Sequence, residues 1–345
     1  MISQEERIKR LTPPAGQIRA VIDSDTFNEV DDQFAIAYAL QSSERLNVEA
    51  IYAAPYTDLG VKLRGEVDEN WPRTGMELSY SEILNILRLS GHEGSCSVFP
   101  GSSHYLKDMQ TPVESAAARD LVQRAMSGTE PLYVLALGAI TNIASAILME
   151  PALVDRIVVV WLGGQPQHFP YSIEFNMSQD WFASRFLLDC GVPLVQIPCF
   201  TVASHLITTT FELEHYLANS ELGAYLSGIV REKSAEEEAL FPMIPRYLRS
   251  GVLKGLDDTA EAALEAFPSS AYAASRMIWD ISVMAYVINP NWCTSRLVST
   301  PILREDFSWE HTSNRHLMRE CSFIHRNFVF GDMFQKLNKT TKKED

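Results

Sequence analysis

The sequence is poor in cysteine, and its few cysteines lie far apart. There are five in 345 residues, an odd number, and no two of them form a CxxC pair. Secreted folds that depend on disulfides are usually small and carry denser, paired cysteines. The sequence therefore argues against a disulfide-stapled scaffold and predicts reduced thiols.

Positive charge is also scarce. The chain has 29 lysines and arginines against 44 aspartates and glutamates, which gives a formal net charge of −15. A protein that binds nucleic acid needs a basic face for the phosphates, and docking on anionic lipid needs one too. We therefore expect neither nucleic acid nor a membrane surface as a partner.

Long apolar runs are missing as well. The first residues, Met1–Arg7, are polar and lack the apolar stretch of a signal peptide. No uninterrupted apolar run reaches the roughly 18–20 residues that span a bilayer. Because 46% of all residues are hydrophobic, a large core is still expected. These features together predict a soluble, cytoplasmic globular protein.

What the sequence does contain is an alternation of short apolar runs with helical patterns. Strand-like runs cover residues 18–23, 48–54, 131–137, 157–162 and 193–197. Strands separated by helices predict an α/β fold with an open, mostly parallel, Rossmann-like sheet and helices on both faces. In such sheets ligands bind at the carboxyl ends of the strands.

The second half of the sequence is more helical and shows no internal repeat or linker. Helices are predicted over residues 212–238 and 272–287, and further strands at a sheet edge over residues 296–302 and 322–330. We expect a single domain over residues 1–335. The polar, lysine-rich residues 336–345 are expected to form a flexible tail.

An acidic loop after the first predicted strand is the most informative segment. It carries five carboxylates within ten positions, and no lysine or arginine lies between residues 19 and 45. These carboxylates belong to Asp23, Asp25, Glu29, Asp31 and Asp32. Helix capping and a solvated loop would explain some of them. Closely packed carboxylates repel one another unless they are neutralised, however, and a hard divalent cation with oxygen ligands would do so.

Together with three later segments, this loop resembles the inosine–uridine-preferring nucleoside hydrolase superfamily. That family usually has DxDxGxDD, whereas here the loop is two residues longer and contains Asn28-Glu29, typical of a branch with an NExDDQ-like loop. Residues 135–144 (LALGAITNIA) resemble ALGPLTNIA, residues 160–164 (VWLGG) resemble a strand ending in MGG, and residues 173–176 (IEFN) resemble AEFN. The late Trp279-Asp280 stands where the family has His-Asp. The resemblance covers residues 18–290 and implies the family's nucleoside hydrolase fold.

The resemblance implies an N-glycosyl hydrolase that releases ribose and free base from ribonucleosides or related N-ribosides, using a metal-bound water. It implies Ca²⁺ held by the side chains of Asp25, Asp32 and Asp280 and by the backbone carbonyl of Leu137. Asp25 would also be the general base. Asp23 is expected to be a structural acceptor. The resemblance further implies a homodimer or homotetramer and a role in purine metabolism.

Substrate-binding residues also follow from the resemblance. Asp31, Glu174 and Asn176 would hold ribose hydroxyls, and the carboxylates of Asp31 and Glu174 would suit the positive charge that develops on the sugar. Trp279 replaces a histidine that can act as a leaving-group acid, so it would either stack on the base or pack in the core. Two further candidates are His168, which precedes the IEFN segment, and Asn28.

Two other interpretations of the sequence remain open. A non-catalytic homologue that binds nucleosides or sugars would keep the site but lack turnover, which the longer loop and Trp279 permit. A haloacid-dehalogenase-like phosphatase also carries DxD after its first strand, as in Asp23-Ser24-Asp25. That family prefers Thr or Val where Phe27 stands here, and it would leave the later segments unexplained.

Overall fold

The computed structural model describes residues 2–238 and 275–338, and its centre is an eight-stranded sheet of order β3-β2-β1-β4-β5-β6-β12-β9. All neighbouring strands are parallel except β12 and β9. The bounds are β1 Ile18–Ser24, β2 Leu46–Ala53, β3 Ser97–Pro100, β4 Leu132–Ala136, β5 Ile157–Leu162, β6 Leu194–Ile197, β9 Cys293–Ser299 and β12 Leu317–Ile324. The predicted fold class is confirmed.

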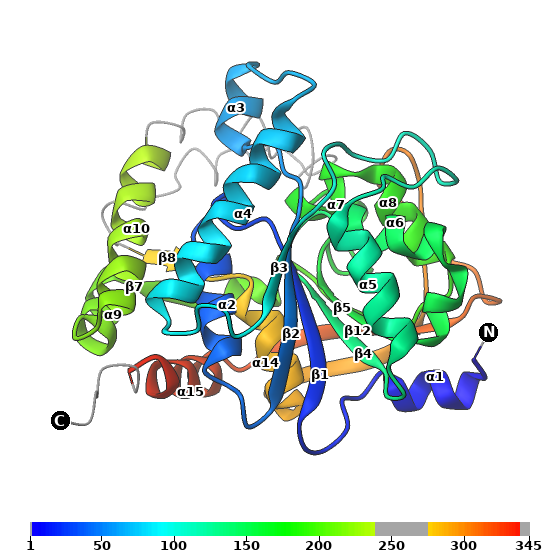
Figure 1. The fold of residues 1–345 in the computed structure, drawn as a ribbon. Helices are drawn as coiled ribbons and strands as arrows, with labels where there is room; N and C mark the ends of the chain where they lie inside the picture. Colours follow the sequence, from blue (N-terminus) through cyan, green and yellow to red (C-terminus); the bar gives the residue numbers. More distant parts are fainter. Residues whose placement is uncertain (1, 239–274, 339–345) are drawn as a thin grey trace.

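Helices cover both faces of this sheet (Figure 1). One layer contains α2 Asp31–Leu40, α4 Trp71–Leu89, α9 Thr210–Leu217, α10 Glu221–Glu238, α14 Ile281–Ile288 and α15 Arg326–Asn338. The other contains α5 Ala116–Ser127, α6 Thr141–Met149 and α8 Trp181–Asp189. Shorter helices are α1 Gln4–Arg10, α3 Leu59–Arg64 and α7 Phe175–Gln179, with 3₁₀ turns at Pro151–Asp155, Ala203–His205 and Pro290–Trp292.

Alternation along the central strands divides the core into two parts. In β4, Tyr133 and Leu135 pack in the α2 layer, whereas Leu132, Val134 and Ala136 pack in the α5 layer. Successive side chains of a strand point to opposite faces, so a strand covered on both faces is apolar throughout. This explains why the central strands were recognisable as continuous apolar runs.

Two small two-stranded sheets flank the main one. They pair β7 Ile207–Thr209 with β8 Ser275–Met277, and β10 Ile302–Leu303 with β11 Trp309–Glu310. Within the described part of the chain, no helix is both long and apolar enough to cross a membrane.

Several predicted boundaries differ from the structure. The helix predicted over residues 272–287 is strand β8 followed by α14, and residues 272–274 lie outside the described residues. The predicted strand 322–330 is the end of β12 followed by α15, because apolar spacing in a short segment fits both element types. The predicted tail boundary at residue 335 falls inside α15, and residues 339–345 lie outside the described residues.

Candidate active site

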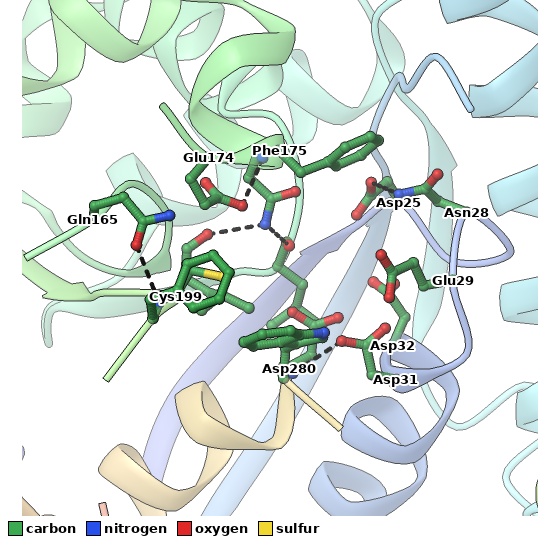
Figure 2. Close-up of a pocket in the computed structure, with 15 residues that line it drawn as sticks. Asp25, Asn28, Glu29, Asp31, Asp32, Gln165, Glu174, Phe175, Cys199 and Asp280 are labelled. Carbon is green, nitrogen blue, oxygen red and sulfur yellow. Dashed lines mark hydrogen bonds between the residues drawn. The ribbon is translucent and has the colours of Figure 1, made fainter. Parts of the chain in front are cut away.

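A pocket opens at the carboxyl ends of β1, β4, β5 and β6 (Figure 2). Ligands of open α/β sheets bind at this edge. The pocket walls come from the loop after β1, the starts of α2 and α7, and the segment between β8 and α14. The lining residues are Asp25, Asn28, Glu29, Asp31, Asp32, Leu137, Leu162, Gln165, Glu174, Phe175, Asn176, Cys199, Phe200, Trp279 and Asp280.

The acidic loop is folded tightly over the end of β1. Asp25, the first residue after the strand, is 2% exposed, and the Asn28 amide donates to its Oδ2 at 3.2 Å. The turn between them places Phe27 at a φ of 83°. The Ser24 hydroxyl donates to Oδ1 of Asp32 at 2.5 Å. The loop therefore directs Asp25 and the first turn of α2 into one buried space.

Asp31, Asp32 and Asp280 form a compact cluster of three buried carboxyl groups, with one oxygen of each within 4.8 Å of the others. Asp31 and Asp32 open α2, and Asp280 precedes α14 and donates its backbone N–H to Oδ2 of Asp31 at 3.3 Å. Figure 2 shows both helix ends meeting at this cluster.

The cluster has the properties of a site for a hard cation. Burial, and then repulsion from neighbouring carboxylates, raises the pKa of Asp31 and of Asp280 well above the usual value, and burial raises that of Asp32 to about 6. Burial followed by repulsion from Asp32 also raises the pKa of Asp25. Buried carboxylate oxygens without a nearby cation are costly, and a divalent ion such as Ca²⁺ or Mg²⁺ relieves that cost. The donor set fits such an ion.

The predicted metal ligands Asp25, Asp32, Leu137 and Asp280 all line the pocket. The compact cluster, however, contains Asp31 in addition to Asp32 and Asp280, and not Asp25. The Leu137 carbonyl accepts the Asn176 amide at 2.6 Å, which leaves it a second lone pair. The structure thus gathers these side chains, and their roles as ligands stay predictions.

Glu174 and Asn176 also line the pocket, but both have structural partners. Glu174 caps α7: its carboxylate accepts the backbone N–H of Gly164, Asn176 and Met177 at 2.8–3.1 Å. Burial raises the pKa of Glu174 to about 7. The Asn176 amide donates to the carbonyls of Leu137 and Leu162. These bonds fix the orientation of both side chains toward the pocket.

Asp23 is buried but lies outside the pocket. Its Oδ1 accepts the Asn142 amide at 2.8 Å, while its Oδ2 has no hydrogen-bond partner. Burial raises the pKa of Asp23 to about 7. This position agrees with the structural role expected of it.

An aromatic wall lies beside the carboxylates. Trp279 is partly buried and packs edge-to-face against Phe200, with ring centroids 6.1 Å apart. Phe175 lines the pocket as well and carries the ammonium group of Lys62 at 4.9 Å from its ring centroid. Trp279 lines the pocket and also packs against the core, so its surroundings fit both stacking on a base and core packing.

The predicted site residue His168 is not brought to the pocket. It is exposed and packs edge-to-face on Phe169 with ring centroids 5.1 Å apart. It lies in the long connection between β5 and α7, whose path is set by tertiary contacts that a nearby sequence motif does not reveal.

Sequence reasoning missed several lining residues: Glu29, Leu162, Gln165, Phe175, Cys199 and Phe200. Cys199 and Phe200 closely follow β6. Because ligands bind at the carboxyl ends of parallel strands, this position could have identified them. Glu29 was noted only as part of the acidic loop. Its ion pair with Arg276, 2.7 Å long, joins residues 247 positions apart and has no local signal.

Proteins of known family resemble this chain in sequence. Residues 74–322 match the family model described as inosine-uridine preferring nucleoside hydrolase. A probable uridine nucleosidase 2 of Arabidopsis thaliana is 25% identical over 229 residues, which cover 61% of this chain and 68% of the relative. A putative pyrimidine-specific ribonucleoside hydrolase RihB of Shigella boydii is 33% identical over 84 residues, 24% of this chain and 35% of the relative. The chain thus aligns with only about a third of the latter's length.

Solved structures share the fold. A purine-preferring ribonucleoside hydrolase from Gardnerella vaginalis has a TM-score of 0.68 at 17% identity, covering 94% of this chain and 99% of that one. The family match begins at residue 74, so the acidic loop precedes the matched range. The pocket joins that loop to five later segments that lie within the matched range.

Proposed function

Because this chain belongs to the inosine–uridine preferring nucleoside hydrolase family, we propose that it hydrolyses the N-glycosidic bond of ribonucleosides in the pocket lined by its acidic loop. The family match confirms the predicted family and the predicted enzyme class, an N-glycosyl hydrolase. The observation that carries the proposal for this pocket is the buried cluster of Asp31, Asp32 and Asp280 beside Asp25.

We propose Ca²⁺ as the metal, held by Asp25, Asp32 and Asp280 and by the carbonyl oxygen of Leu137. All four groups line the pocket and offer only oxygen, which calcium prefers. A divalent cation there would lower the pKa of water and offset the repulsion among the carboxylates. Asp31 belongs to the same compact cluster, so ribose and metal would share its surroundings.

The protein groups divide the remaining work. Asp25 takes the proton of the attacking water, a task suited to a carboxylate with a raised pKa. Asp31, Glu174 and Asn176 hold the ribose hydroxyls. As the glycosidic bond breaks, positive charge develops on the ring, and the fixed carboxylates stabilise it. Trp279 stacks on the leaving base, with Asn28 at the loop side of the pocket.

The two other interpretations are not favoured. The family match assigns a hydrolase fold that a haloacid-dehalogenase-like phosphatase does not have. A binding protein without turnover would not need a buried base such as Asp25 beside a cation site.

We further propose that the enzyme works in the cytoplasm as a homodimer or homotetramer. All five cysteines are free thiols, which suits a reducing compartment. Phe323 and Phe328 are exposed large apolar side chains, joined through ring contacts with His325, and exposed apolar clusters often mark interfaces. Sedimentation analysis would test the oligomer; a monomer at micromolar concentration would contradict it.

Release of free ribose tests the function directly. The chain should liberate ribose from uridine or inosine in the presence of CaCl₂, and a chelator should stop the reaction. Refilling with calcium should restore it. Ribose release that persists in the chelator would contradict the metal, whereas phosphate release from phosphomonoesters without ribose release would contradict the whole assignment.

A further inference from the structure

The pocket is strongly one-sided in charge. Six carboxyl groups line it, those of Asp25, Glu29, Asp31, Asp32, Glu174 and Asp280. Among the described residues that line it there is no lysine, arginine or histidine. A divalent cation balances two of the six negative charges, so the metal alone does not explain the excess.

Glu29 adds a negative charge to the pocket and lies outside the compact cluster of Asp31, Asp32 and Asp280. Its side chain is 30% exposed, and its carboxylate is paired with Arg276 at 2.7 Å. Arg276 is not a lining residue, so it balances Glu29 from behind the pocket wall.

Counting formal charges gives the size of the imbalance. Six ionised carboxylates, one divalent cation, the Arg276 guanidinium and the Lys62 ammonium group over the Phe175 ring leave an excess of two negative charges (6 − 2 − 1 − 1). Such an excess in a buried space attracts a further cation and repels a developing anion. A neutral nucleoside loses its base as an anion unless an acid protonates it, so this pocket disfavours that departure.

The aromatic wall supplies the matching surface. Trp279 and Phe200 line the pocket beside the carboxylates, and Phe175, which also lines it, already carries the Lys62 ammonium group. A flat aromatic cation interacts with such ring faces through cation–π attraction and with the carboxylates through charge. Neutral bases gain only the stacking component.

We propose that the preferred substrates are ribosides of a cationic heteroaromatic base, of which a pyridinium riboside is the simplest. This inference rests on the proposed function. The bond between C1′ and the ring nitrogen breaks, and its electron pair passes to the nitrogen, which becomes neutral. The water oxygen bonds to C1′, and Asp25 takes the proton. The products are ribose, a neutral base and one proton, so no leaving-group acid is required.

Kinetics with a matched pair of substrates test the proposal. Nicotinamide riboside carries a cationic ring, and its 1,4-dihydro form has nearly the same shape without the charge. With CaCl₂ present, kcat/KM for nicotinamide riboside should exceed that for the dihydro form, uridine and inosine by at least tenfold. Equal or greater kcat/KM for the neutral substrates would overturn the inference and leave the proposed function standing. No ribose from any substrate would overturn both.

A binding measurement separates recognition from intrinsic reactivity. 1-Methylnicotinamide is a cation and nicotinamide is neutral, and neither can be hydrolysed here. Calorimetry should give a Kd for the cation at least tenfold lower than for the neutral compound. Equal Kd values would contradict the proposal.

Substitution of Glu29 tests whether its charge causes the preference for a cationic substrate. Glu29→Gln should reduce kcat/KM for nicotinamide riboside about tenfold and that for uridine less than threefold. The matched control is Glu93→Gln, which removes the same charge from an exposed turn before β3, at the opposite end of the strands, and should change neither value. An equal loss on both substrates in Glu29→Gln would assign Glu29 a purely structural role and contradict the proposal.

Discussion

At Asp25, burial opposes the ionised form of a carboxyl group that the proposed reaction uses. Asp25 is 2% exposed, and burial and its carboxylate neighbours raise its pKa. A group of this kind destabilises the metal-free fold when it is ionised. The same raised pKa suits a general base near neutral pH.

Replacing Asp25 by asparagine should abolish ribose release while leaving the fold intact. Loss of a general base typically costs a factor of about 10²–10⁴ in rate. Because the substitution removes one repelling charge, the metal-free variant should unfold at the same temperature as the parent or higher. Ribose release and a thermal melt in chelator check both parts. Near-normal turnover would contradict the role of Asp25 as base.

At the scale of elements, the turn between β4 and α6 shapes the pocket without contributing a charged group. Gly138 lies so close to Asp25 that an added Cβ would be 2.5 Å from its Oδ1. Asn142, in the first turn of α6, ties three strand ends together: it accepts from Ser102 and donates to Asp23 and to the Ala53 carbonyl. The turn therefore has both a positioning role and a structural one.

Gly138→Ala should displace Asp25 and lower kcat at least about 100-fold, because misplacement by about 1 Å of a catalytic group has that cost. Gly228→Ala is the matched control, since an added Cβ on α10 meets nothing within 4 Å. Gly228→Ala should keep full activity and raise the free energy of unfolding by about 0.5–1 kcal/mol. Steady-state kinetics and thermal melts measure both. Unchanged kcat in Gly138→Ala would contradict the close approach.

Asn142→Ala should lower the free energy of unfolding by about 3 kcal/mol, since it leaves buried partners unsatisfied. Asn327→Ala, on the exposed start of α15, should change it by less than about 0.5 kcal/mol. Urea denaturation compares them. Equal effects would mean that the Asn142 bonds add little stability.

At the scale of the whole molecule, the sheet brings buried negative charge from distant segments to one edge. Asp31 and Asp32 on α2 meet Asp280 before α14, about 250 positions later in the chain. Any ion that binds this cluster in the folded state must therefore stabilise the entire domain.

Calcium should raise the thermal midpoint. At 100 times its Kd, a ligand specific for the folded state adds about 2.7 kcal/mol. Asp280→Asn should reduce the shift strongly, whereas Asp306→Asn, on a surface turn near β11, should keep it. Differential scanning fluorimetry with CaCl₂ and with chelator measures the shift. No shift with any divalent ion would contradict the metal site.

The metal-free protein should also lose stability as pH rises from 5 to 8. Asp23 and Glu174 each have a pKa of about 7 in the folded state, above the unfolded values of about 4. The folded state thus binds their protons more tightly. Their contribution is present below about pH 4 and is lost as pH rises through about 7, amounting to about 4 kcal/mol for Asp23. Urea midpoints in chelator measure it, and Asp23→Asn should flatten the slope. A rising stability would contradict these shifts.

Much of the fold and part of the site could be predicted from local sequence. The central strands are continuous apolar runs, and the acidic loop and the segments around Leu137, Glu174 and Asp280 carry short, recognisable motifs. Local patterns could not resolve β8 from α14, because β8 has only three residues and lies close before the apolar α14. They also could not place His168, whose exposed position depends on the path of a long connection.

By itself the sequence determined that strands alternate with helices and that carboxylates crowd the loop after β1, because both are properties of neighbouring residues. Only the tertiary structure decided which carboxylates share one space, that Glu29 pairs with Arg276, and that Phe200 joins Trp279 beside them. Those contacts join residues far apart in the chain. Their distances follow from how the strands and helices pack, which no local pattern encodes.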